Sequence, residues 1–160
     1  MSDKEEQKVK TPYPFFIHDQ YVKDISFENP NYLVKYSETD KQSQVSVNVE
    51  TNVIKLNDDN YEVTMSVSAK STLEETSIFV LELVYACVIS IARDIEHDIL
   101  EQILLVHCPF LMFPFAREAV ASITRYGGYP PLVIEPIDFS LLYIEKKKAL
   151  VTGGEEGASN

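Results

Sequence analysis

Two stretches of alternating polarity restrict this chain to a fold built on an antiparallel β-sheet. Four valines and a threonine occupy every second position from residue 45 to 53, and Tyr, Val, Met, Val and Ala do so from residue 61 to 69. A period of two places the apolar side chains on one face of a strand and the polar ones on the other. The link at residues 57–60 (NDDN) is turn-forming. The pattern predicts a hairpin with one dry face and one wet face.

A third apolar stretch, residues 77–91, differs because both of its faces are apolar. One face carries Phe79, Leu81, Leu83 and Tyr85, and the other carries Ile78, Val80 and Val84 together with Glu82. A strand of this kind needs cover on both sides. We therefore expect helices on one face, and a subunit interface or a binding surface on the other.

The remaining elements complete an α+β pattern, with strands first and helices afterwards. Residues 15–28 predict a first strand, which a break at 29–31 (NPN) and a polar connection separate from the hairpin. Helical spacing begins after residue 93, and helices are predicted from there to residue 103, over 109–126 and over 137–150. Pro109 suits a first helical turn, and Pro114 predicts a kink or the true helix start. We expect one domain over residues 11–151 with mobile ends at 1–10 and 152–160.

Charge and cysteine content narrow the classes of function. The chain holds 25 acidic and 14 basic residues, for a net charge of −11. This balance argues against nucleic acid and anionic membranes as partners, and leaves open either a basic partner or acidity that only maintains solubility. The two cysteines form no CxxC motif, and no secretory signal or membrane span is recognisable. These features predict a reduced, cytoplasmic protein.

No arrangement of residues predicts catalysis, a cofactor or a metal. P-loop, GxGxxG and GxSxG motifs are absent. His97 with Asp94 and Glu101 is typical of a solvated helix face, and His107 beside Cys108 is typical of core packing. The sequence instead concentrates aromatic residues in its first quarter and around residues 110–115. Aromatic surface on an acidic body is typical of a soluble protein that binds apolar segments of other polypeptides.

Four segments resemble the SecB protein-export chaperone family in order and spacing. They are residues 21–30 (YVKDISFENP), 85–89 (YACVI), 108–118 (CPFLMFPFARE) and 128–139 (GYPPLVIEPIDF), and the resemblance covers roughly residues 15–150. It implies a four-stranded antiparallel sheet with a crossover after the first strand and two packed helices, assembled as a dimer of dimers. It also implies an ATP-independent holdase that binds unfolded precursors and delivers them to the SecA translocation ATPase.

The same resemblance implies three sets of functional residues. The basic, zinc-carrying tail of SecA would dock on Asp24, Glu28, Val80 and Glu82. Clients would contact Tyr32, Tyr36, Phe79 and Tyr85, for which core or interface packing is the alternative. Subunits would meet at Val84, Pro109, Phe113, Arg117 and Glu118. Two positions depart from the family pattern, because Val80 stands where a larger Leu is common and Cys87 where Gly is usual.

Two other functions stay open at this stage. A SecB-like holdase for a non-export client, such as an antitoxin-type partner, would share the fold without needing the acidic SecA patch. A small-ligand-binding α+β domain would need convergent polar residues in a pocket, which the sequence does not offer. The presence of Asp24, Glu28 and Glu82 favours the export chaperone.

Overall fold

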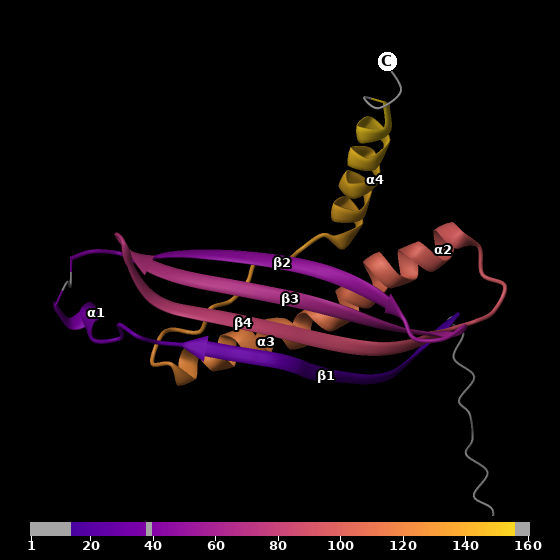
Figure 1. Ribbon diagram of the computed structural model, residues 1–160. Helices are drawn as coiled ribbons and strands as arrows, with labels where there is room; N and C mark the ends of the chain where they lie inside the picture. Colours follow the sequence, from indigo (N-terminus) through magenta and orange to yellow (C-terminus); the bar gives the residue numbers. More distant parts are fainter. Residues whose placement is uncertain (1–13, 38–39, 156–160) are drawn as a thin grey trace, which may run out of the picture.

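A four-stranded antiparallel sheet forms the body of the computed structural model, which describes residues 14–37 and 40–155 (Figure 1). Its strands are β1 (Phe15–Glu28), β2 (Gln44–Lys55), β3 (Asn60–Leu73) and β4 (Thr76–Ile91). They lie in the order β1-β4-β3-β2, so the segment after β1, which contains the short α1 (Val34–Ser37), crosses to the opposite edge. The predicted α+β class, the sheet and its crossover are confirmed.

Strand register explains why the hairpin has a dry face. Val49 lies opposite Val67, which in turn lies opposite Leu83, so the three side chains share one face of the sheet. The turn that sets this register is held by Asn57, whose Oδ1 accepts hydrogen bonds of 3.1 Å from the backbone N–H groups of Asp59 and Asn60.

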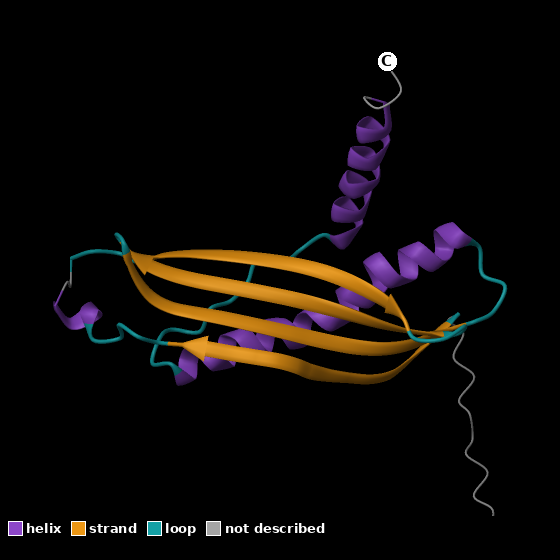
Figure 2. Ribbon diagram, viewed as in Figure 1, coloured by secondary structure: helices purple, strands orange, loops and turns teal. Residues whose placement is uncertain are grey.

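A single long helix replaces the two helices predicted between residues 93 and 126. It comprises α2 (His97–Gln102), a π-helical turn η1 (Ile103–His107) and α3 (Cys108–Tyr126), which continue one into the next (Figure 2). Pro109 lies in the first turn of α3, as predicted, although η1 precedes it without a break, and Pro114 lies inside α3 and not at a helix start. Proline lacks an N–H group and crowds the carbonyl four residues earlier. The widened turn before Pro109, in which the Cys108 N–H bonds to the Ile103 carbonyl, accommodates that ring.

Helix α3 covers one face of the sheet, which we call the inner face. There it contacts β3 and β4, and the fully buried side chains include Val63, Met65, Leu81, Met112 and Val120. In Figure 1 the sheet lies in front of α3, and no described element lies over the centre of the opposite face, which we call the open face. The hydrophobic core is thus one-sided, as expected for a single chain of this pattern.

By length and composition alone, the His97–Tyr126 helix could cross a membrane, with a mean hydropathy of 1.6 in its most apolar window. One side of it packs on the sheet, and core helices of soluble proteins share these properties. The final helix, α4 (Phe139–Glu155), projects away from the body (Figure 1). Asp138 caps it by accepting hydrogen bonds from the N–H groups of Ser140 and Leu141.

Helix α4 is longer than predicted. Residues 152–155, assigned from sequence to a mobile end, form its last turn. The predicted mobile segments 1–10 and 156–160 lie outside the described residues.

Candidate functional site

Aromatic side chains gather where β1 ends, β4 begins and α3 ends, and we call this group the aromatic cluster. Successive ring centroids lie 5.0–6.2 Å apart along the series Phe27, Phe79, Tyr129, Tyr32 and Tyr36. Phe79 is buried, whereas Tyr36 is 68% exposed and the neighbouring Leu33 is 74% exposed. The cluster therefore joins the core to an apolar surface on the crossover segment.

Side-chain amides fix the crossover segment against the end of α3. Asn29 donates through Nδ2 to the Gly127 carbonyl at 3.0 Å and accepts a hydrogen bond from the Tyr129 hydroxyl. Asn31 donates to the Ser77 carbonyl at 2.8 Å. Gly128 has a φ of +89°, and a Cβ there would meet the ring of Tyr32. These contacts explain the NPN and GGY segments as supports of the cluster.

The structure brings together three of the four residues predicted to bind clients. Tyr32, Tyr36 and Phe79 belong to the aromatic cluster. Tyr85 lies elsewhere on β4, where its ring stacks on Phe115 with centroids 6.3 Å apart. Tyr85 and Phe79 are both buried, so within one chain only the two crossover tyrosines present surface. Leu33 belongs to the same surface and was not predicted.

A second apolar surface, which we call the β2 groove, has a volume of 520 Å³ and was not predicted from sequence. Its walls are the edge strand β2, the segment 132–137 and the first turns of α4. The apolar residues that line it are Val45, Val47, Val49, Leu132, Val133, Ile134, Pro136, Ile137 and Leu142. The alternation of β2 placed its valines on one face, but residues 132–137 have no periodicity that would place them opposite. Because β2 is an edge strand, its outer backbone groups are not paired within the sheet.

The four residues predicted to bind SecA lie on the open face, and we call them the acidic patch. Glu28 pairs with Val80, Glu82 pairs with Ser26, and Asp24 pairs with Val84. Directly paired residues share a face, so all four side chains do so. A register shift between Val22 and Asp24 reverses the alternation of β1 and turns Asp24 to this side.

A depression of 260 Å³ lies beside the acidic patch on the open face. Asp24 and Glu82 line it, and Glu50 of β2 adds a third carboxylate that the sequence did not predict. Sequence spacing placed Val80 and Glu82 together, but only the sheet order brings β2 to the same surface.

The nearest lysine on β1 does not neutralise the patch. Lys23 forms an ion pair with Glu62 of β3, and Tyr21 donates a second hydrogen bond to the same carboxylate. These bonds, Lys23 first, hold the pKa of Glu62 below its usual value, and the bond to Glu62 raises the pKa of Tyr21 to about 12. Among the described residues, Lys70 shares the open face but forms no ion pair with the patch. The patch therefore keeps its negative charge.

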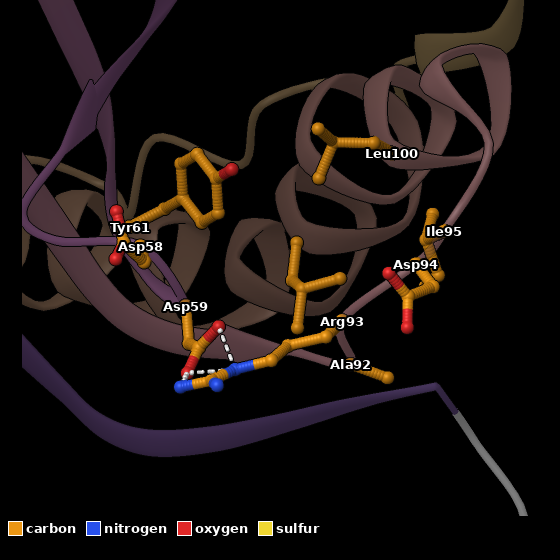
Figure 3. Close-up of a pocket in the computed structure, with 9 residues that line it drawn as sticks. Asp58, Asp59, Tyr61, Ala92, Arg93, Asp94, Ile95 and Leu100 are labelled. Atoms are coloured by element: carbon orange, nitrogen blue, oxygen red, sulfur yellow. Dashed lines mark hydrogen bonds and ion pairs between the residues drawn. The ribbon is translucent and has the colours of Figure 1, made fainter.

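A polar pocket at the far end of the sheet is closed by its own ion pair (Figure 3). Arg93 donates from Nε and Nη2 to the Asp59 carboxylate at 2.8–3.0 Å, joining the β2–β3 turn to the segment after β4. The guanidinium holds the pKa of Asp59 below its usual value. Because Arg93 and Asp59 neutralise each other, their ion pair serves to hold these two segments together.

The described residues offer no catalytic or metal centre. No group of three or more His, Cys, Asp or Glu within them could hold a metal ion. Cys87 and Cys108 are free, buried thiols between β4 and α3. Hydrogen bonding with the Cys87 thiol, together with burial, raises the pKa of Cys108, so that thiol stays protonated.

The residues predicted to form the subunit interface do not make one surface in the single chain. Val84 is half-buried on the open face, whereas the helix lies on the inner face. Pro109 and Phe113 are buried in the chain's own core, and Glu118 is exposed and accepts a hydrogen bond from Ser122. Arg117 keeps a buried Nε that has no hydrogen-bond partner. The helix instead exposes Phe110 (66%), Leu111 and Phe115.

Comparisons with known proteins show to which family this chain belongs. The family described as preprotein translocase subunit SecB matches residues 6–150. The protein-export protein SecB of Afipia carboxidovorans is 42% identical over 124 residues, which are 78% of this chain and 76% of that protein. The SecB of Rhodospirillum centenum is 37% identical over 151 residues, 94% of this chain and 90% of that one. The chain belongs to the SecB family.

A solved SecB-like structure shares the fold. The SecB-like chaperone of Mycobacterium tuberculosis, determined with a peptide from an antitoxin, superposes with a TM-score of 0.63 at 14% identity, covering 78% of this chain and 91% of that one. SecB proteins are chaperones of protein export, and membership gives this chain a holdase role in export. Cys87, which departs from the family pattern, is accommodated in this chain by burial of its thiol against Cys108 of the helix.

Proposed function

We propose that this member of the SecB family is an ATP-independent cytoplasmic holdase that binds unfolded secretory precursors, keeps them competent for translocation and delivers them to the SecA ATPase. Two apolar surfaces support client binding, namely the crossover tyrosines with Leu33, and the β2 groove. Extended, unfolded segments could contact apolar side chains there and pair with the free edge of β2. Because binding withdraws non-native chain from folding and aggregation by mass action, no nucleotide is required.

The observation that carries delivery to SecA is the grouping of Asp24, Glu28 and Glu82 on one uncovered face. Together with Glu50 they give that face a concentrated negative charge. A basic tail would be attracted to it and guided into register, and Val80 adds an apolar contact in the same row. The four patch residues do not line the β2 groove or belong to the crossover tyrosine surface, which would let the protein hold a client and SecA at once.

Assembly into a dimer of dimers would cover the apolar surface left by one chain. Strand β1 is an unpaired sheet edge, and an exposed edge invites pairing with another strand. Phe110, Leu111 and Phe115 are exposed on the helix, and the buried Nε of Arg117, which has no hydrogen-bond partner within the described chain, would gain one if a second subunit covered it. Pro109 and Phe113 would then support the interface from within the core.

Charge reversal in the patch tests delivery to SecA. Glu82→Lys should weaken binding to SecA about tenfold at low salt, because one attraction is replaced by a repulsion. Glu145→Lys on the exposed side of α4 changes the net charge equally and should leave binding unchanged. Calorimetry or surface plasmon resonance at several salt concentrations gives the affinities. Native mass spectrometry checks that both variants keep the oligomer and still capture an unfolded polypeptide.

Equal SecA affinity for the two variants would contradict the patch assignment. A wild-type protein that captures unfolded polypeptide normally but does not bind SecA would instead favour a SecB-like holdase that serves a non-export client.

A further inference from the structure

Helix α4 is attached to the body by few apolar contacts. Phe139 in its first turn is buried, with its ring 5.8 Å from that of Phe113. From residue 140 to residue 153 every residue is exposed except the half-buried Tyr143. Since one aromatic pair anchors a helix only at its start, other contacts must set the direction of α4.

Glu101 on α2 provides those contacts. Its Oε2 accepts a hydrogen bond from the Tyr143 hydroxyl at 2.8 Å and lies 3.2 Å from the Lys147 Nζ. Its other oxygen pairs with His97 at 3.2 Å. Lys147 also lies 3.7 Å from Asp98 and 4.9 Å from the centroid of the Tyr143 ring. The hydrogen bonds from Tyr143 and Lys147 lower the pKa of Glu101, so the carboxylate is charged at neutral pH.

The same stretch of α4 forms part of the β2 groove. Leu142, adjacent in sequence to Tyr143, lines the groove opposite the valines of β2. Tyr143 and Lys147 are four residues apart and lie on one side of the helix. A rotation of α4, or its separation from α2, would therefore have two effects at once. It would break the bonds to Glu101, and it would move Leu142 out of the wall of the β2 groove.

We propose that Glu101 is a positioning residue that holds α4 against α2, keeps Leu142 in the wall of the β2 groove and thereby slows the release of bound unfolded chain. This inference rests on the proposed holdase function, because it concerns the surface on which a client would lie. The bonds are polar and only partly buried, so they are strong enough to bias α4 and weak enough to open when a longer segment enters.

Matched variants separate this role from a general effect on folding. Glu101→Gln and Lys147→Met remove the bonds, whereas Glu96→Gln and Lys148→Met make the same chemical changes at exposed positions that form no ion pair in the described structure. Hydrogen exchange of the full-length oligomer reports the opening of α4 over residues 139–155, with the amides of β3 and β4 as a check on the fold. Fluorescence anisotropy gives the dissociation rate of a labelled polypeptide that reduction and alkylation keep unfolded.

Glu101→Gln and Lys147→Met should each speed exchange in α4 about fivefold and speed client dissociation in parallel, with β3 and β4 unchanged. The difference from wild type should shrink as salt rises, because exposed ion pairs are screened. Unchanged α4 exchange, or faster exchange with unchanged client dissociation, overturns the role of Glu101. Failure of the wild-type protein to bind the unfolded polypeptide overturns the proposed function instead, and is recognised in the same titration.

Discussion

The two faces of the sheet are made by the same strands, yet they differ in what they bury. On the inner face, β3 and β4 contribute unbroken rows of buried apolar residues, such as Val67 and Leu83, against α3. On the open face the neighbouring Val84 is half-buried and stands among Ser66, Asp24 and Glu82. The comparison shows that apolar composition on both sides of a strand does not make two cores. The side that faces a helix carries stability, and the other remains available for recognition.

The open face nevertheless carries a polar interaction that covers part of the central strand. Ala86 is fully buried there, although no helix of the described chain covers that face. Tyr21 of β1, which lies opposite Ala86, and Glu62 of β3, which lies opposite Val88, reach across β4 next to this small residue and bond to each other. A larger residue at position 86 would obstruct that bridge, so the small side chain permits a polar clamp over the central strand.

Thiol reactivity should give the largest contrast between the two faces. Cys87 and Cys108 are fully buried on the inner side, so a thiol reagent should reach them only when the core opens. A probe cysteine on the open face, Ser46→Cys, should react about a thousandfold faster or more under the same conditions. Mass spectrometry after timed labelling measures both rates in one protein. Rapid labelling of Cys87 in the native oligomer would show that α3 does not protect the inner face.

Most of the inner face could be predicted from sequence because alternation is a local signal. The limits of β1, the hairpin and the dry side of β3 follow from spacing and turn chemistry alone. The long helix was divided wrongly because proline predicts a boundary locally. The π-helical turn that absorbs Pro109 depends on packing against the sheet. Prediction from neighbouring residues therefore failed to join the two helices, because tertiary contacts stabilise the π-helical turn between them.

The sites were harder to predict because they join distant segments. Asp24 and Glu82 carried a recognisable family pattern, whereas Glu50 meets them only because β2 lies in the same sheet. The β2 groove depends on an extended segment with no periodicity of its own. The family resemblance implies a common role for Tyr85 and Phe79, and both lie on one face of β4, but six residues of extended strand separate them by about 20 Å. Sharing a face is not the same as sharing a site.

The same substitution should destabilise the fold more on the inner face than on the open face. Val67→Ala removes two buried methyl groups and leaves a cavity, so it should lower the free energy of unfolding by about 2 kcal/mol. Val84→Ala on the open face should lower it by less than about 1 kcal/mol, since its side chain keeps contact with solvent. Urea denaturation at matched protein concentration measures both. Equal losses would mean that another subunit buries the open face around Val84 as completely as α3 buries Val67.

The smallest expected effect concerns the polar clamp, because Tyr21→Phe removes one hydrogen bond and leaves Lys23 on Glu62. The free energy of unfolding should fall by about 1 kcal/mol near neutral pH. Tyr126→Phe, at a highly exposed tyrosine, serves as the control and should change nothing. Denaturant titrations across the pH range measure the difference.

The pH dependence of the stability difference between wild type and Tyr21→Phe tests whether the polar clamp causes that difference. The pKa of Tyr21 rises from 10.0 to about 12 in the fold, so its contribution is complete below pH 10 and is lost as pH rises toward 12. The pKa of Glu62 is lowered from 4.5, so its contribution is complete above that value and is lost as pH falls through the lowered pKa. Wild type and Tyr21→Phe should therefore differ most between these limits and converge on both sides. A difference that stays constant from acid to alkaline pH would mean that the hydroxyl contributes by packing, and that the open face has no charged clamp over Ala86.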